Sequence, residues 1–299
     1  MDEKRYFQSY DDATLMYRCW QPALAQQEQS IPIVLLHGAA SNSTRWWHFT
    51  EHSRLTTDRL LLRPDLRGNG ESIWRTATGA TAGIDHWTQD IAAMLRHEKQ
   101  ERAVILGHCL GANIAAHFAA RYPEMCAGLI LVEPMAARAL TGYLARMRPF
   151  TPLLKVIVKI ISLFNRFGLY RRRLDTVDLK QLDQPVHQAS AEERDQALSN
   201  HGSIWHDLKI IPLAQFVNNF IALSHLLPVE DIQCPGLVIQ ARGISMTDPE
   251  KTKALLGTLP MMEFIELESE HWIPTTHPDL LCQFVDEWVL KHQDFSHAS

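Results

Sequence analysis

The sequence predicts an α/β protein, with a mostly parallel central sheet flanked by helices and an inserted, mainly helical cap. Short apolar runs rich in β-branched residues alternate with longer segments of helical spacing. One such run ends at Gly107 and is followed by a cysteine, a second glycine and an alanine-rich stretch. The alternation stops between about residues 135 and 232. We therefore predict a core made of residues 1–134 and 233–299, and a helical cap over 135–232.

The chain begins with a predicted β-hairpin over residues 6–20, where alternating apolar positions flank a polar turn. Residues 31–36 are almost continuously apolar, which is typical of a strand buried on both faces of a parallel sheet. This strand ends in His37-Gly38-Ala39-Ala40. A glycine there lets the backbone bend, so the Ala39 N–H is either part of an ordinary turn or an oxyanion donor above the sheet.

The same two patterns predict the other core elements. Helices are expected over residues 45–55, 85–102, 249–259 and 278–290, and strands over 59–65, 103–107, 127–134, 235–240 and 264–267. In a parallel sheet the carboxyl ends of the strands share one edge, where sites form. His37, Cys109 and Glu133 all follow strands, so we expect them at that edge.

The sharpest local signal is Gly107-His108-Cys109-Leu110-Gly111, between a predicted strand and a predicted helix. It has the form of a strand–turn–helix elbow, in which the middle residue is strained and side chains on either side would meet neighbouring backbone. A thiol there stands at a helix N-terminus, which favours the reactive thiolate. The alternative is that Cys109 is a buried packing residue.

Composition narrows the class of protein. The net charge of −5 and pI near 6.3 give no reason to expect a nucleic-acid partner. The five cysteines are widely spaced and include no Cys-x-x-Cys pair, so we expect a reduced, cytoplasmic protein without a bound metal or cofactor. The charged N-terminal residues show no signal-peptide pattern, and no apolar run reaches the length of about 18 residues needed to cross a membrane.

The cap contains an unusually apolar stretch over residues 152–169. Its polar residues Lys155, Lys159, Ser162 and Arg166 fall on one narrow stripe, and Arg171-Arg172-Arg173 follows. One interpretation is a helix that borders an acyl pocket or makes transient contact with a membrane surface. The other is a cap helix packed on the core with solvated lysines. Both favour an apolar small-molecule substrate over a sugar or a nucleotide.

Taken together, these residues resemble the α/β-hydrolase superfamily over nearly the whole chain. The matching pieces are the His37-Gly38 loop, residues 65–72, the elbow at Cys109, the inserted cap, and His271 after the last strand. The resemblance implies a nucleophile, an acid and a histidine in that chain order. It therefore implies that His271 takes the proton of Cys109.

The chain departs from the usual family pattern in two ways. A cysteine rather than a serine stands at the elbow, as in dienelactone hydrolases and polyhydroxyalkanoate synthases. The family acid is expected near Gly243 or Ile244, but no acid stands there, and Asp248 comes later. In haloalkane dehalogenases, which belong to the same superfamily, the acid instead follows the sheet strand before that one. The corresponding position in this chain resembles theirs, because Glu133 lies at the end of the predicted strand 127–134. We favour Glu133 over Asp248, and a Cys109–His271 dyad is the third alternative.

The resemblance implies an acyl-transfer enzyme acting on an ester or thioester with an apolar acyl part. Cys109 would form an acyl-thioenzyme, the Ala39 and Leu110 amides would hold the oxyanion, His271 would move the proton, and Glu133 would orient His271. Thiol chemistry favours a transferase, although a thioesterase or esterase uses the same steps. The alternative class is a non-catalytic ligand receptor on the same fold, for which Cys109 need not be reactive.

Overall fold

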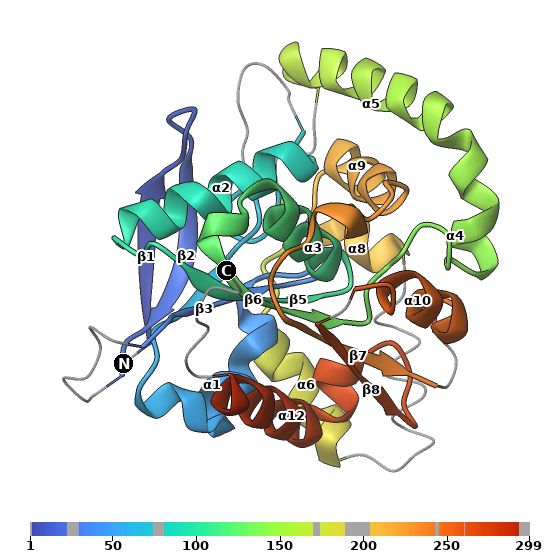
Figure 1. Ribbon diagram of the computed structural model, residues 1–299. Coiled ribbons are helices and arrows are strands. Elements are labelled where there is room, and N and C mark those ends of the chain that lie inside the picture. The colour runs from blue at the N-terminus through green and yellow to red at the C-terminus, as the bar shows by residue number, and fades with distance from the viewer. Residues whose placement is uncertain are drawn as a thin grey trace.

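An eight-stranded sheet forms the centre of the molecule (Figure 1). It is seen in a computed structural model that describes residues 2–22, 30–73, 81–169, 174–188, 204–242, 245–259 and 261–292. The strand order is β1-β2-β4-β3-β5-β6-β7-β8, in which β1, β2 and β4 pair antiparallel and all later neighbours pair parallel. The strands are β1 (Asp2–Gln8), β2 (Thr14–Trp20), β3 (Ile33–Leu36), β4 (Leu61–Pro64), β5 (Ala103–His108), β6 (Cys126–Val132), β7 (Gly236–Ala241) and β8 (Met262–Leu267). The predicted mostly parallel sheet is confirmed.

Helices cover both faces of the sheet. Figure 1 shows α2 (Ile84–His97) and α3 (Leu110–Arg121) above it, and α1 (Trp47–His52) and α12 (Pro278–Lys291) below it. Strand β3 is fully buried because its side chains alternate between the two layers: Val34 and Leu36 join the core under α2 and α3, and Ile33 joins the core over α1 and α12. This explains the continuous apolar run at residues 31–36.

Two predicted helices have the wrong extent. The helix expected over residues 45–55 is divided into η2 (Ser43–Trp46), α1 and η3 (Arg54–Thr57), because Ser53 is extended and its hydroxyl caps η3. The helix expected over 85–102 ends at His97, and Lys99 takes a φ of 55°, which turns the chain back toward β5.

The segment between β6 and β7 is mainly helical in the part that the structure describes, with irregular stretches such as 133–141 and 174–178 between the helices. It contains α4 (Gly142–Met147), η5 (Arg148–Phe150), α5 (Thr151–Arg166), α6 (Leu179–Gln188), α8 (Ile204–Ile210), α9 (Leu213–Leu223) and η6 (Val229–Asp231). The division into core and cap stays a prediction. The basic run 171–173 lies outside the described residues.

A buried ion pair fastens α6 to the core. Arg45 Nη1 lies 2.7 Å from Asp183 Oδ2, and both side chains are almost wholly buried. Asp183 also accepts hydrogen bonds from the Trp47 indole and the Thr275 hydroxyl. A buried carboxylate needs such partners, so this position fixes how α6 sits on α1 and on α11 (Ile273–Thr276).

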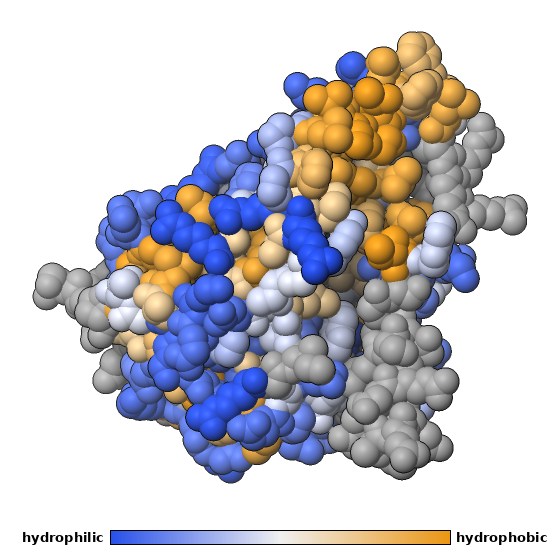
Figure 2. Space-filling view, turned by 90° about the vertical axis from the view of Figure 1, so that its right-hand side faces the viewer, coloured by the Kyte–Doolittle hydropathy of each residue, from blue (hydrophilic) through white to orange (hydrophobic). Residues whose placement is uncertain are grey.

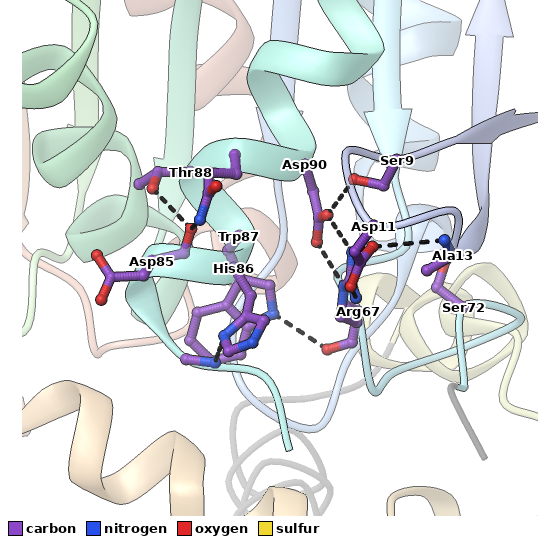
Figure 3. Close-up of polar contacts among 12 residues, drawn as sticks. Ser9, Asp11, Ala13, Arg67, Ser72, Asp85, His86, Trp87, Thr88 and Asp90 are labelled. Atoms are coloured by element: carbon purple, nitrogen blue, oxygen red, sulfur yellow. Dashed lines mark hydrogen bonds and ion pairs between the residues drawn. The ribbon is translucent and has the colours of Figure 1, made fainter. Parts of the chain in front are cut away.

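Arg67, in the loop after β4, is the centre of a second buried polar cluster, which joins the hairpin to α2. The Arg67 guanidinium pairs with Asp11 at 2.6 Å and with Asp90 at 2.6 Å, and Ser9 donates to Asp90 (Figure 3). Arg67 thereby ties the β1–β2 hairpin to α2 on one face of the sheet.

Candidate active site

Cys109 stands alone between the end of β5 and the start of α3, in a strained backbone conformation with φ 55° and ψ −118°. The two flanking glycines make this turn possible. A Cβ on Gly107 would lie 2.2 Å from the Gly111 carbonyl oxygen, and one on Gly111 would lie 2.4 Å from that of Leu36. Both contacts are with backbone that cannot give way, so the elbow needs these glycines.

His271 and Glu133 form a buried hydrogen-bonded pair. His271 Nδ1 donates to Glu133 Oε2 at 3.0 Å, and the two side chains are 4% and 1% exposed. The other ring nitrogen, Nε2, is buried and makes no hydrogen bond to the described residues. Burial favours the neutral ring, but the interactions of His271 with the neighbouring Cys109 and with Glu133 outweigh burial and raise the pKa of His271 to about 10.

Glu133 follows β6 and is held in place from three sides. Its backbone takes a φ of 50°. Besides accepting from His271, its carboxylate accepts from the Ala241 N–H at 2.5 Å and from the Ser245 hydroxyl at 2.6 Å. A strained residue with a saturated carboxylate is typical of a functional position.

Asp248, the alternative acid, is occupied elsewhere. Its carboxylate caps α10 (Pro249–Leu256) by accepting from the Lys251 N–H, and it pairs with the Lys251 ammonium. Gly243 and Ile244, where the family pattern places the acid, lie outside the described residues. The structure thus brings Glu133 to His271 and gives Asp248 another partner.

The two predicted oxyanion donors flank Cys109. Leu110 is the first residue of α3, so its N–H has no acceptor within the helix. Ala39 shares a cavity with Cys109. A Cβ on Gly38 would lie 3.2 Å from the Cys109 Cβ, which shows how closely this loop approaches the elbow. Ala40, next in the loop, has a φ of 46°.

Two buried histidines brace the site. His37 Nδ1 donates to the Gly38 carbonyl, and its Nε2 accepts from the Leu66 N–H; burial lowers its pKa to about 4, so the ring is neutral. His108 Nε2 donates to the His271 carbonyl oxygen at 3.1 Å, and burial lowers its pKa well below the ordinary value. These hydrogen bonds of His37 and His108 were not predicted from the sequence, nor was the hydrogen bond from Ser245 to Glu133. The sequence indicated them only weakly, through a histidine at the end of each apolar strand and a hydroxyl residue in the turn after β7.

Cys109 and His271 open into a cavity of about 580 Å³. Its wall is mostly apolar, and many of the apolar side chains belong to the segment between β6 and β7, among them Tyr143, Leu144, Met147, Leu154, Phe216 and Phe220. Arg45, His206 and Asp207 are polar exceptions. Burial raises the pKa of Asp207 to about 7. The cavity volume suits a small molecule with a substantial apolar part.

Within the described ranges, no group of three or more His, Cys, Asp or Glu side chains is placed to hold a metal ion. No helix in the same ranges has both the length and the apolarity to cross a membrane.

The chain belongs to the α/β-hydrolase family, since the family model described as "alpha/beta hydrolase fold" matches residues 31–278. Solved structures agree on the fold. An esterase from Thermogutta terrifontis superposes with a TM-score of 0.68 at 18% identity, covering 97% of this chain and 99% of its own. The enol-lactonase from Burkholderia xenovorans LB400 gives 0.65 at 18% identity, covering 96% and 100%. The predicted α/β-hydrolase fold is confirmed.

Curated relatives match over shorter stretches. "Lipase LipV" from Mycobacterium tuberculosis is 30% identical over 105 residues, which is 35% of this chain and 38% of the relative. "1-acylglycerol-3-phosphate O-acyltransferase ABHD5" from Rattus norvegicus is 28% identical over 135 residues, which is 45% of this chain and 38% of the relative. The matched region spans little more than a third of each relative.

Proposed function

We propose that this protein is an acyl-transfer enzyme that uses Cys109 as its nucleophile on an ester or thioester with an apolar acyl part. One observation carries the proposal. The strained elbow presents Cys109 to the same cavity as His271, whose far ring nitrogen is hydrogen-bonded to Glu133. Nucleophile, base and orienting acid are the three parts of this type of catalysis.

In the first half-reaction, the Cys109 sulfur forms a bond to the substrate carbonyl carbon and the carbonyl electrons move onto oxygen. The Ala39 and Leu110 N–H groups would stabilise that oxyanion. When the tetrahedral intermediate collapses, the bond to the alcohol or thiol breaks and an acyl-thioenzyme remains. His271, protonated at neutral pH by its raised pKa, gives its proton to the leaving group.

In the second half-reaction, the neutral His271 takes a proton from water or from another acceptor, which attacks the thioester carbonyl. Water yields an acid, whereas an alcohol, amine or thiol yields a transferred acyl group. Cys109 leaves as the thiolate, and the His271–Glu133 pair returns to its starting state. A thioester reacts readily with amines, so a thiol nucleophile supports transfer as well as hydrolysis.

The cavity supports the substrate class. Its wall is mostly apolar, and its volume of about 580 Å³ accommodates an acyl chain beside Cys109. The lipase and acyltransferase names of the curated relatives point to the same kind of substrate.

A matched pair of variants tests the proposal. Cys109→Ala should abolish turnover of p-nitrophenyl esters and acyl-thioesters, whereas Cys234→Ala, which removes a half-buried thiol that does not line the cavity, should leave turnover unchanged. Wild-type activity should also be lost on alkylation by iodoacetamide, with the label mapped to the Cys109 peptide. Full activity in Cys109→Ala would exclude the cysteine mechanism. Absence of turnover and of alkylation at Cys109 in the wild type would favour the receptor alternative.

A further inference from the structure

Helix α5 is apolar on two sides, although only one side faces the protein. Its inner side, which includes Leu154 and the buried Val158, packs on α9. Five residues of the same helix project apolar side chains outward. The outward apolar residues are Leu153, Val156, Ile160, Leu163 and Phe164, each between 49% and 55% exposed. Their spacing of three and four residues places them on one continuous stripe.

The figures show where this stripe lies. In Figure 1, α5 is an outermost helix, lying beyond α9 at the top of the molecule. Figure 2, turned by 90°, shows hydrophobic residues gathered over the same upper part of the surface. A contiguous exposed apolar area of this kind marks an interaction site.

A basic stripe runs beside the apolar one. Lys155, Lys159 and Arg166 share a narrow face of α5, and none of them pairs with a carboxylate in the part of the chain that the structure describes. The sequence from residue 135 to 174 contains nine basic residues and no acidic one, in a chain whose net charge is −5. This segregation of charge favours an anionic partner.

The surface is continuous with the mouth of the cavity. Leu154 of α5 and Met147 of α4 line the cavity, as does Tyr143, which is 62% exposed. Ile204 of α8 also lines the cavity and is 47% exposed. A partner seated on α5 would therefore lie next to the opening that leads to Cys109.

We propose that α5 docks this protein on an anionic lipid membrane. The α5 surface, defined as the five outward apolar residues together with Lys155, Lys159 and Arg166, would place its apolar stripe among the acyl chains and its basic stripe at the phosphate headgroups. A second copy of the same surface would bring cations toward cations, whereas anionic lipid complements them. This inference goes beyond the proposed function, because binding requires no reaction at Cys109.

The test is co-sedimentation of the full chain with vesicles. The protein should bind vesicles of phosphatidylcholine with about 30% phosphatidylglycerol, more weakly at high salt, and bind pure phosphatidylcholine poorly. Ile160→Ser/Phe164→Ser should lower the partition coefficient more than about tenfold, and so should Lys155→Gln/Lys159→Gln. The matched controls Leu226→Ser and Lys209→Gln change an exposed leucine and a lysine outside α5, and should bind like the wild type.

Three results would overturn the proposal. The first is equal binding of the wild type and the α5 variants, and the second is no binding to anionic vesicles at all. The third is a dimer, detected by light scattering, that Ile160→Ser/Phe164→Ser dissociates while no vesicle binding is seen. Turnover of soluble p-nitrophenyl acetate should be unchanged in the α5 variants, and Cys109→Ala should bind vesicles normally, so failure of docking and failure of the proposed chemistry are told apart.

Discussion

Glu133 accepts a hydrogen bond from His271 Nδ1 at 3.0 Å, although 138 residues separate them in the chain. The two residues come from the loops after β6 and β8, and β7 lies between these strands in the sheet. The loop after β7 contributes the Ser245 hydroxyl, which donates to the same carboxylate oxygen. The Glu133 carboxylate therefore comes from the end of β6, and the Ser245 hydroxyl that holds it in place comes from the end of the neighbouring strand β7.

Glu133→Gln should lower kcat/KM by about 10²- to 10⁴-fold, because the amide keeps the shape but removes the charge that supports His271. The measurement is turnover of a p-nitrophenyl ester at neutral pH. Asp248→Asn is the matched control and should stay near wild type, since Asp248 caps α10. A large loss of kcat/KM in Asp248→Asn and none in Glu133→Gln would assign the role of the acid to Asp248. If neither variant changed kcat/KM, catalysis would depend on a Cys109–His271 dyad without an acid.

The pH profile should report His271. Its pKa is raised to about 10, so the imidazolium that protonates the leaving group persists at neutral pH and is lost as the pH rises through about 10. Wild-type kcat/KM should therefore fall only above that range. In Glu133→Gln the fall should begin at lower pH, because one of the groups that raise the pKa of His271 is gone. Identical alkaline limbs in the two proteins would contradict this account.

Asp207 should make substrate binding and stability depend on pH near 7. Burial raises its pKa in the folded protein from 3.8 to about 7, so folding favours the neutral acid. The unfolded chain ionises first, and stability falls as the pH rises from about 4 through 7. The Tm of the wild type should therefore fall between about pH 4 and pH 7 relative to the Tm of Asp207→Asn. The KM of the wild type for an apolar ester should rise as the pH increases through 7. Parallel Tm curves and equal KM trends would show that Asp207 does not titrate there.

Arg67→Met should destabilise the fold by about 3 kcal/mol, because it leaves the buried Asp90 without its cation (Figure 3). Urea unfolding measures the loss. The control Lys291→Met removes an ion pair with Glu263 in which both side chains are exposed, and it should cost less than about 1 kcal/mol. Equal costs for the two variants would mean that the Arg67 cluster contributes no more than a surface pair.

The elbow and the sheet could be predicted because their causes are local. Two glycines around Cys109 are needed to avoid backbone collisions. A run such as residues 31–36 is apolar because both faces of its strand are buried. Helix ends were harder to place, since the left-handed turn at Lys99 has no signal in apolar periodicity.

The partners within the site could be predicted only in part. Glu133 and Asp248 were both candidates, and the choice depends on where strand ends fall in three dimensions. Ser245 and His108 were missed because a hydroxyl in a loop and a histidine in a strand carry no periodic pattern. For α5, the sequence showed apolar residues around most of the helix but could not show which side another helix covers.

The most direct test of the account is intact-mass spectrometry of the protein mixed with a p-nitrophenyl ester or an acyl-thioester and quenched in acid. We expect a mass gain of one acyl group, mapped to the Cys109 peptide, absent from Cys109→Ala, and lost on standing in water or faster with an added amine. Turnover without any adduct at Cys109, or an adduct that persists in Cys109→Ala, would contradict the assignment of Cys109 as the nucleophile.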